Sequence, residues 1–300
     1  MEPNIELAKP RDFGELISDT FTFIKQNLKP LLKFFFIFCG FFVVATAAST
    51  ILLAVRAMNL VQSVDPNDFD SQTVFGRFLP LLWVYLLLAV FVILQAVTFN
   101  VMVLSFMTIY KQKRNVPPTT EEMWGYIKFY FLRILGSSIL LYILLIFGLL
   151  FCFIPGIYLA PIFALVPAIM IMENTSFGYA FNQSFKLIRD NWWVTFGVFV
   201  VVYIILAVLN YIVNLPATIL GAGNLFLHLT SKTSAPLSLT AIVLSAVLQS
   251  FTYFFQILLL VAVGLCYYNL SESKEGTSLM ERMDEFGKGS TEPGPQPEEY

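Results

Sequence analysis

Side chains that commonly carry out catalysis are scarce in this 300-residue chain. It has one histidine, His228, which excludes sites that need several imidazole groups, such as iron oxygenases or zinc proteases with two histidine ligands. The cysteines, Cys39, Cys152 and Cys266, lie in separate apolar runs and lack the spacing of a metal site or a disulfide framework. The sequence also lacks a glycine-rich phosphate loop. We therefore expect a non-enzymatic protein without cofactor or metal.

Side-chain amides are the main polar groups inside the long apolar stretches: Gln95, Asn100, Asn210 and Gln256. Such an amide can bond a neighbouring helix, which contributes about 0.6 kcal/mol on average, or it can line a polar path for a substrate. The sequence leaves both interpretations open. Charged residues do not occur in the middle of these stretches, which argues against coupling to protons or sodium through buried carboxylates.

The composition indicates a membrane protein, because 57% of the residues are hydrophobic and only 13% are charged. About 20 apolar residues in a helix cross the hydrocarbon core of a bilayer. By this measure the sequence predicts six spans, near residues 34–55, 79–110, 132–153, 157–172, 193–213 and 237–268.

Basic residues beside the spans predict the orientation, since lysine and arginine are retained on the cytoplasmic side. Of the 18 lysines and arginines, all but Arg56, Arg77 and Lys232 fall on one face of the predicted topology. Both termini are then cytoplasmic. Residues 1–30 form a cytoplasmic N-terminal region, residues 31–270 the membrane domain, and residues 271–300 a cytoplasmic tail with a short helix and a disordered end.

The segment between the fourth and fifth spans, residues 177–192, places apolar or small side chains at helical spacing opposite polar ones. Ser184 lies on the apolar stripe, and Lys186 and Arg189 lie beside it. A helix of this kind is typical of the membrane interface. It either supports the adjoining spans or forms a cytoplasmic collar that gates a path or docks a partner.

The same pattern occurs in two other places, each before a span. Residues 13–28 (FGELISDTFTFIKQNL) align without gaps on residues 177–192 (FGYAFNQSFKLIRDNW), and a weaker copy begins at the capping box of Thr119 to Glu122. We therefore predict an all-α integral membrane protein with six transmembrane helices in three hairpins. A cytoplasmic interfacial amphipathic helix precedes each hairpin.

The fourth predicted span differs from the others because it is short and contains Pro161 and Pro167. We expect a tight turn around Pro155 and Gly156 to join it to the third span. Proline-broken helices line substrate sites in some transporters, but proline also occurs in packed membrane helices. Glu173 follows the span at the cytoplasmic edge, where it either stabilises the next helix or contacts a ligand.

The run IPGIYLAPIFALVPAIMIMENTSFGYAFNQSFKLIRDNWWVTFGVF, residues 154–199, resembles the glycerophosphoryl diester phosphodiesterase membrane-domain family and related multi-pass bacterial membrane proteins. The residues that match its pattern are Ile154, Pro155, Gly156, Glu173, Ser184, Trp192 and Trp193. The resemblance implies a helical protein of the bacterial inner membrane. It does not imply the phosphodiesterase reaction, because the catalytic barrel of that family is a separate soluble domain of about 250 residues.

Two functions follow as hypotheses. The first is a non-enzymatic scaffold or accessory subunit, whose partners are the lipid bilayer and a membrane or cytoplasmic protein, with no role for nucleic acid. The second is a transporter or channel for a lipid-related or other small solute. The amides distinguish the two: their replacement alters only stability in a scaffold but alters function in a transporter.

Overall fold

The structure is a computed structural model that describes residues 5–63, 71–151, 153–231 and 239–276. Every regular element in these ranges is a helix, so the predicted all-α class is confirmed. The helices are α1 (Phe13–Phe34), a π-helical turn (Phe35–Cys39), α2 (Gly40–Ser63), α3 (Ser71–Gln112), α4 (Thr120–Phe151), α5 (Phe153–Met172), α6 (Phe177–Ile188), α7 (Trp192–Ser231), α8 (Leu239–Phe255) and α9 (Ile257–Glu275).

Six helical segments are long and apolar enough to cross a membrane, as the sequence predicts. They are Phe13–Leu60, Leu79–Gln112, Thr120–Leu150, Pro155–Met172, Trp192–Gly223 and Leu239–Lys274. In the first segment α1 continues through the π-helical turn into α2. In the last, α8 and α9 meet at Gln256.

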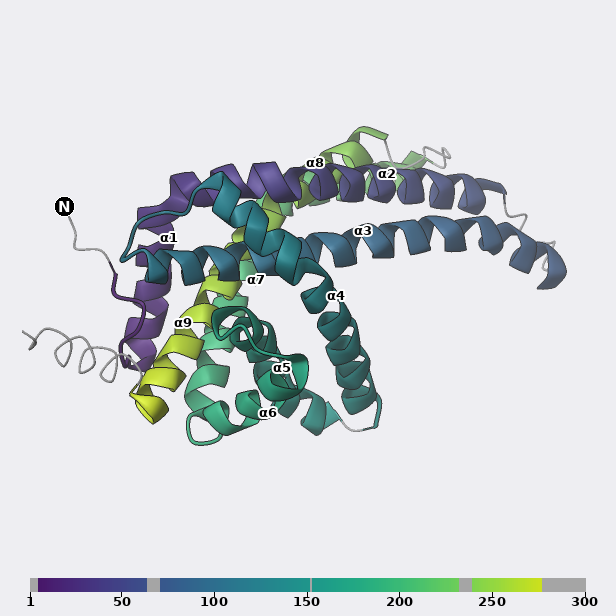
Figure 1. Cartoon of the computed structure of the whole chain (residues 1–300). Coiled ribbons are helices and arrows are strands. Elements are labelled where there is room, and N and C mark those ends of the chain that lie inside the picture. The colour runs from purple at the N-terminus through teal and green to yellow at the C-terminus, as the bar shows by residue number, and fades with distance from the viewer. Residues whose placement is uncertain (1–4, 64–70, 152, 232–238, 277–300) are drawn as a thin grey trace, which may run out of the picture.

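The first segment bends at Asn27, whose backbone angles (φ −110°, ψ 16°) depart from a helix. Pro30 explains the position, because proline lacks the N–H that would bond the carbonyl of Gln26 and its ring clashes with that turn. The Asn27 side chain donates a hydrogen bond to the Phe23 carbonyl at 3.1 Å. As a result the start of α1 lies across the direction of α2 (Figure 1).

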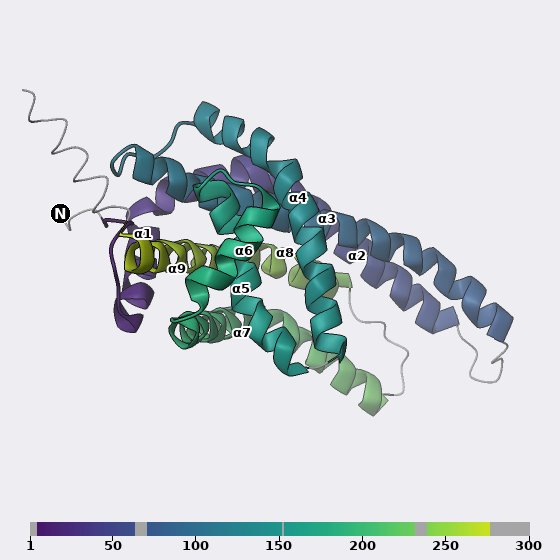
Figure 2. The ribbon, with the colours of Figure 1, turned by 60° about the horizontal axis from the view of Figure 1, so that its bottom comes forward.

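The centre of the fold is formed by α3, α5 and α9, which pack against one another in all three pairs. Their buried side chains include Met102, Phe106, Leu165, Ile169, Val261 and Leu265. Gly264 allows the close crossing, since a Cβ atom there would lie 2.5 Å from the Met107 sulfur and 3.2 Å from the Met172 methyl group. Away from this centre α2 and α3 run side by side as a long arm (Figures 1 and 2).

Two segments bury side chains four, three and four residues apart, and a third buries them at the first two of these spacings. The buried residues are Leu16, Thr20, Phe23 and Asn27 in α1, and Met123, Ile127, Tyr130 and Ile134 in α4. In α6 the positions that correspond are Ala180, Ser184 and Leu187. Each segment packs against the end of a different central helix, α1 against α9, α4 against α3 and α6 against α5.

The starts of these segments correspond as well. Asp12 and Thr119 each form a reciprocal capping box with the glutamate three residues later, Glu15 and Glu122. Ser176 occupies the equivalent N-cap of α6. The sequence similarity between the three segments thus extends to their N-cap and buried positions, although the Ser176 side chain makes no capping hydrogen bond.

The predicted turn around Pro155 and Gly156 is wrong. Both residues lie inside α5, which begins at Phe153. Proline is tolerated in the first turn of a helix, because the N–H groups there lack helical partners. Gly156 lets the helices approach, since a Cβ atom would lie 2.4 Å from a Leu149 methyl carbon of α4. At the other end of the chain α9 continues to Glu275, and the rest of the predicted tail lies outside the described residues.

Candidate functional site

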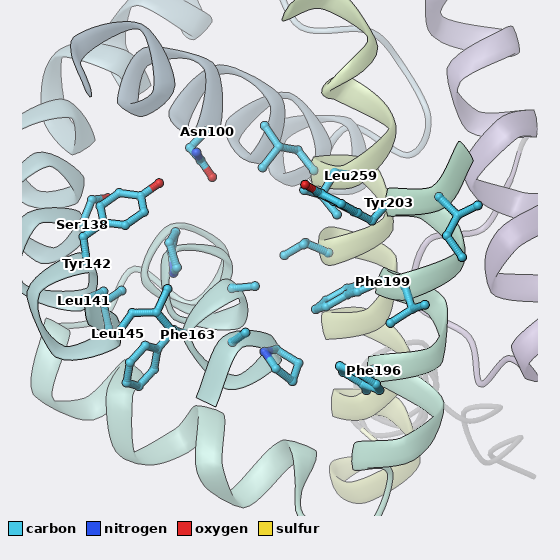
Figure 3. A pocket seen from close by; sticks show the side chains of 18 residues that line it. Asn100, Ser138, Leu141, Tyr142, Leu145, Phe163, Phe196, Phe199, Tyr203 and Leu259 are labelled. Carbon is cyan, nitrogen blue, oxygen red and sulfur yellow. The ribbon is translucent and has the colours of Figure 1, made fainter. Parts of the chain in front are cut away.

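A cavity of about 490 Å³ lies between α3, α4, α5, α7 and α9 (Figure 3). Most of its walls are apolar, formed by residues that include Leu141, Leu145, Phe163, Phe196, Phe199 and Leu259. Ligand pockets in proteins commonly measure about 300–1,000 Å³ and combine apolar walls with a few polar groups. The cavity therefore has the size and lining of a binding site for a small apolar molecule.

Apart from Phe163, α5 presents small side chains to the cavity. Ala160, Pro161, Ala164 and Pro167 follow one face of the helix at spacings of one to three residues. Such side chains do not fill the space between α4 and α7, which lie on opposite sides of the cavity in Figure 3. The two prolines also leave helix carbonyls without their usual N–H donors.

Polar groups gather at one end of the cavity. Asn100 of α3 donates from its side-chain nitrogen to the Ala96 carbonyl at 3.0 Å. Its side-chain oxygen points into the cavity, with the hydroxyls of Tyr142 and Tyr203 on either side (Figure 3). None of the described residues that line the cavity is charged.

The two tyrosines also mark where the cavity opens. Tyr142 is 55% exposed and Tyr203 is 66% exposed, although both line the cavity. Their neighbours on the outer surface, Ile143 and Ile204, are large, apolar and exposed as well. An exposed apolar surface on a membrane-spanning helix faces lipid. In a membrane, an opening at this position between α4 and α7 would face lipid.

The other predicted amides do not line the cavity. Gln95 of α3 accepts a hydrogen bond from the hydroxyl of Thr46 in α2 at 2.9 Å, which joins two helices. Asn210 donates to the Leu206 carbonyl of its own helix at 2.8 Å. Gln256 is exposed at the break between α8 and α9. Of the four amides, the structure brings only Asn100 to the candidate site.

Glu173 and Ser184 contribute to packing at the ends of the helices. The Tyr267 hydroxyl of α9 donates to a Glu173 carboxylate oxygen at 2.8 Å. Ser184 is fully buried and donates to the Phe181 carbonyl at 2.7 Å. Neither residue lines the cavity.

Lys186 and Arg189 are exposed on α6 and just after it. The Lys186 carbonyl accepts a hydrogen bond from the Lys274 ammonium, which also pairs with Asp190 at 2.8 Å. Its hydrogen bond and positive charge hold the pKa of Asp190 below the ordinary value of a carboxyl. The end of α9 is thereby tied to the end of α6, apart from the cavity.

The sequence analysis did not identify Tyr142 and Tyr203 as candidates. Each lies within an apolar run, LLYILL and VVYIIL, in the middle of a span. A phenol hydroxyl far from the end of a span was the signal that could have identified them, because tyrosine in membrane helices usually gathers at the interfaces.

The described residues do not form a site for a metal. No group of three or more histidine, cysteine, aspartate or glutamate side chains lies together among them. Cys39 and Cys266 are buried free thiols in different helices. The side chain of His228 and the whole of Cys152 lie outside the described residues.

The sequence matches none of the known protein-family models, and no curated protein or solved structure is significantly similar to it. The resemblance of residues 154–199 to the membrane-domain family stays a prediction. The interpretation of the site accordingly depends on its geometry.

Proposed function

We propose that this chain is a non-enzymatic multi-pass membrane protein that takes up a lipid-related molecule from the bilayer, and that it acts as a scaffold or accessory subunit. The cavity between α4 and α7 carries the proposal, because it is apolar and opens where Tyr142 and Tyr203 are exposed. A molecule dissolved in the bilayer can enter such a cavity without crossing water.

The proposed arrangement in the membrane has three hairpins, α2 with α3, α4 with α5, and α7 with α8 and α9. The close packing of α2 on α3, α4 on α5 and α7 on α8 supports it. The three segments with matching burial would act as interfacial amphipathic helices. The basic residues beside the spans support cytoplasmic termini, and the resemblance supports a bacterial inner membrane.

The binding of a lipid-related molecule can be tested by filling the cavity. Ala164→Phe adds a large side chain to the cavity wall on α5. Ala89→Phe makes the same change at an exposed position on α3 that does not line the cavity. We expect native mass spectrometry from nanodiscs to detect a retained small molecule in the wild type and in Ala89→Phe, but not in Ala164→Phe. Equal retention by all three proteins would place the bound molecule elsewhere.

A protein partner remains part of the proposal. The exposed side chains of Lys186 and Arg189 offer positive charge at the ends of the helices, where a cytoplasmic partner has access in the proposed orientation. Charge reversal of both residues should release the partner in a mild-detergent purification. Retention of the partner at wild-type stoichiometry would remove these two residues from the interface.

Transport is the second candidate function, and one observation favours it. Pro161 and Pro167 both line the cavity, and proline-broken helices with unpaired carbonyls form substrate sites in transporters. A transporter must move its ligand between leaflets or across the membrane. Purified protein in vesicles that contain a fluorescent lipid analogue should then accelerate loss of fluorescence after an impermeant quencher is added. A rate equal to that of protein-free vesicles would count against lipid transport between the leaflets.

A further inference from the structure

We infer that the ligand of the cavity is an uncharged lipid with a hydroxyl group, which Asn100, Tyr142 and Tyr203 bind near the middle of the bilayer. This inference rests on the proposed function, since it specifies the chemical class of the molecule that the cavity holds. Four features of the cavity support it.

The first feature is the fixed orientation of the Asn100 amide. Only its nitrogen can donate to the Ala96 carbonyl, so the 3.0 Å bond between them determines which atom turns toward the cavity. That atom is the side-chain oxygen, an acceptor (Figure 3). A polar acceptor among apolar walls is costly without a donor. The ligand is therefore expected to supply a donor.

The second feature is the pair of phenols beside this oxygen. The Tyr142 and Tyr203 hydroxyls lie at the same end of the cavity as Asn100, on opposite sides of it (Figure 3). A tyrosine hydroxyl can donate as well as accept. A ligand hydroxyl can donate to Asn100 and accept from a tyrosine at the same time, whereas an ester, ether or ketone oxygen can only accept. The three side chains together favour a hydroxyl group.

The third feature is that the polar end of the cavity lies deep in the bilayer and has no charged residue among its described lining. Asn100 precedes Gln112, the last residue of α3, by twelve positions, which is roughly 18 Å along a helix. Tyr203 follows Trp192, the first residue of α7, by eleven positions, or roughly 16 Å. With these ends at the bilayer surface, both side chains lie near the middle of a core about 30 Å thick. A phosphate or carboxylate at this depth would lack a cation among the described lining residues.

The fourth feature is size. The cavity of about 490 Å³ corresponds to roughly 16 groups of the volume of a water molecule in the liquid, about 30 Å³ each, which is close to the volume of a methylene group. One hydrocarbon chain of this length fits, with its apolar part against Phe163, Phe196 and Phe199. The second chain of a phospholipid would not fit inside and would have to lie in the opening between α4 and α7.

Photolabelling tests the inference with the full chain in detergent micelles. The probe is a sixteen-carbon alcohol with a diazirine in the chain, and labelled peptides are identified by mass spectrometry. Three competitors share the chain length: hexadecan-1-ol, its methyl ether, which cannot donate, and hexadecanoate, which is charged. We expect hexadecan-1-ol to compete about 3- to 10-fold better than the ether, the range that one net hydrogen bond provides. The label should lie on α4 and α7 around the cavity.

Asn100→Leu should remove the preference for the alcohol over the ether while labelling persists. Asn210→Leu is the matched control, because Asn210 makes the same bond within its own helix, 2.8 Å to Leu206, and does not line the cavity. It should keep the wild-type preference. A second variant, Tyr203→Phe, removes one hydroxyl and retains the ring. Because a phenol can donate to an alcohol and to an ether alike, this variant should weaken competition by both and leave their ratio unchanged.

The possible outcomes separate this inference from the proposed function. Saturable labelling of the cavity with equal competition by alcohol and ether would overturn the choice of a hydroxyl lipid and leave lipid binding intact. Stronger competition by hexadecanoate would overturn the requirement for an uncharged ligand. Labelling that no competitor reduces would refute lipid binding in the cavity, and the inference would fail with it.

Discussion

Replacement of Phe23 by alanine should destabilise the fold strongly, although Phe23 belongs to the first helix and lies outside the candidate site. Its side chain is 0% exposed and contacts two rings of α3 edge to face, Phe106 at 6.1 Å and Tyr110 at 5.4 Å between ring centroids. Truncation of a buried phenylalanine removes its packing and leaves a void, at a cost of about 3–5 kcal/mol. The loss should appear as a lower melting temperature in detergent.

Phe21→Ala is the matched control for this experiment. Phe21 lies in the same helix two residues away, but its side chain is 44% exposed. We expect its melting temperature to stay within a few degrees of the wild type, because exposed substitutions usually change stability by less than about 0.5 kcal/mol. If both variants melted at the same temperature, α1 would not be packed on α3 as described.

Three further changes test individual contacts. Gln95→Leu removes a hydrogen bond between α2 and α3 and should lower stability in a denaturant titration by about 0.6 kcal/mol, and a loss of several kcal/mol would contradict this assignment. Asp19→Asn leaves the buried guanidinium of Arg11 without its anion, 2.8 Å away, so hydrogen exchange of residues 5–11 should accelerate, and unchanged protection would contradict the contact. The ion pair of Asp190 with Lys274 contributes at neutral pH and is lost as the pH falls through the lowered pKa of Asp190. Melting curves of the wild type and Asp190→Asn should therefore converge at low pH, and any difference at pH 7 should be small because Asp190 is exposed.

The spans and the helical class could be predicted because they depend on local quantities. A bilayer requires long apolar helices, and the 57% hydrophobic content supplies them in separable runs. The similarity between residues 13–28 and 177–192 also has a structural counterpart, since Thr20 and Ser184 occupy the same place in the alignment and both are fully buried. The spacing of apolar and small residues in the sequence is sufficient to predict which side of a helix is buried.

The site could not be predicted in the same way, because a cavity depends on distances between helices that are far apart in the chain. The sequence analysis identified Asn100 but gave equal weight to Gln95, Asn210 and Gln256. Which amide meets a cavity depends on how α3 is rotated against α4 and α7, and an apolar run carries little information about rotation when lipid and protein are equally apolar. Pro155 was predicted to lie in a turn but lies in the first turn of α5, because proline is as compatible with the start of a helix as with a turn.

The place of α1 in the fold has a consequence for biosynthesis. The backbone N–H of Arg11, just before α1, donates to the side chain of Asn269 at 2.7 Å, and α1 itself packs against α9. Because α1 is synthesised well before α9, this contact forms late, and chain closure over so long a separation is slow. Until α9 has been synthesised, the part of α1 that packs on α9 lacks its partner. A chain that stops before α9 would leave that part of α1 exposed and would be a target for membrane quality control.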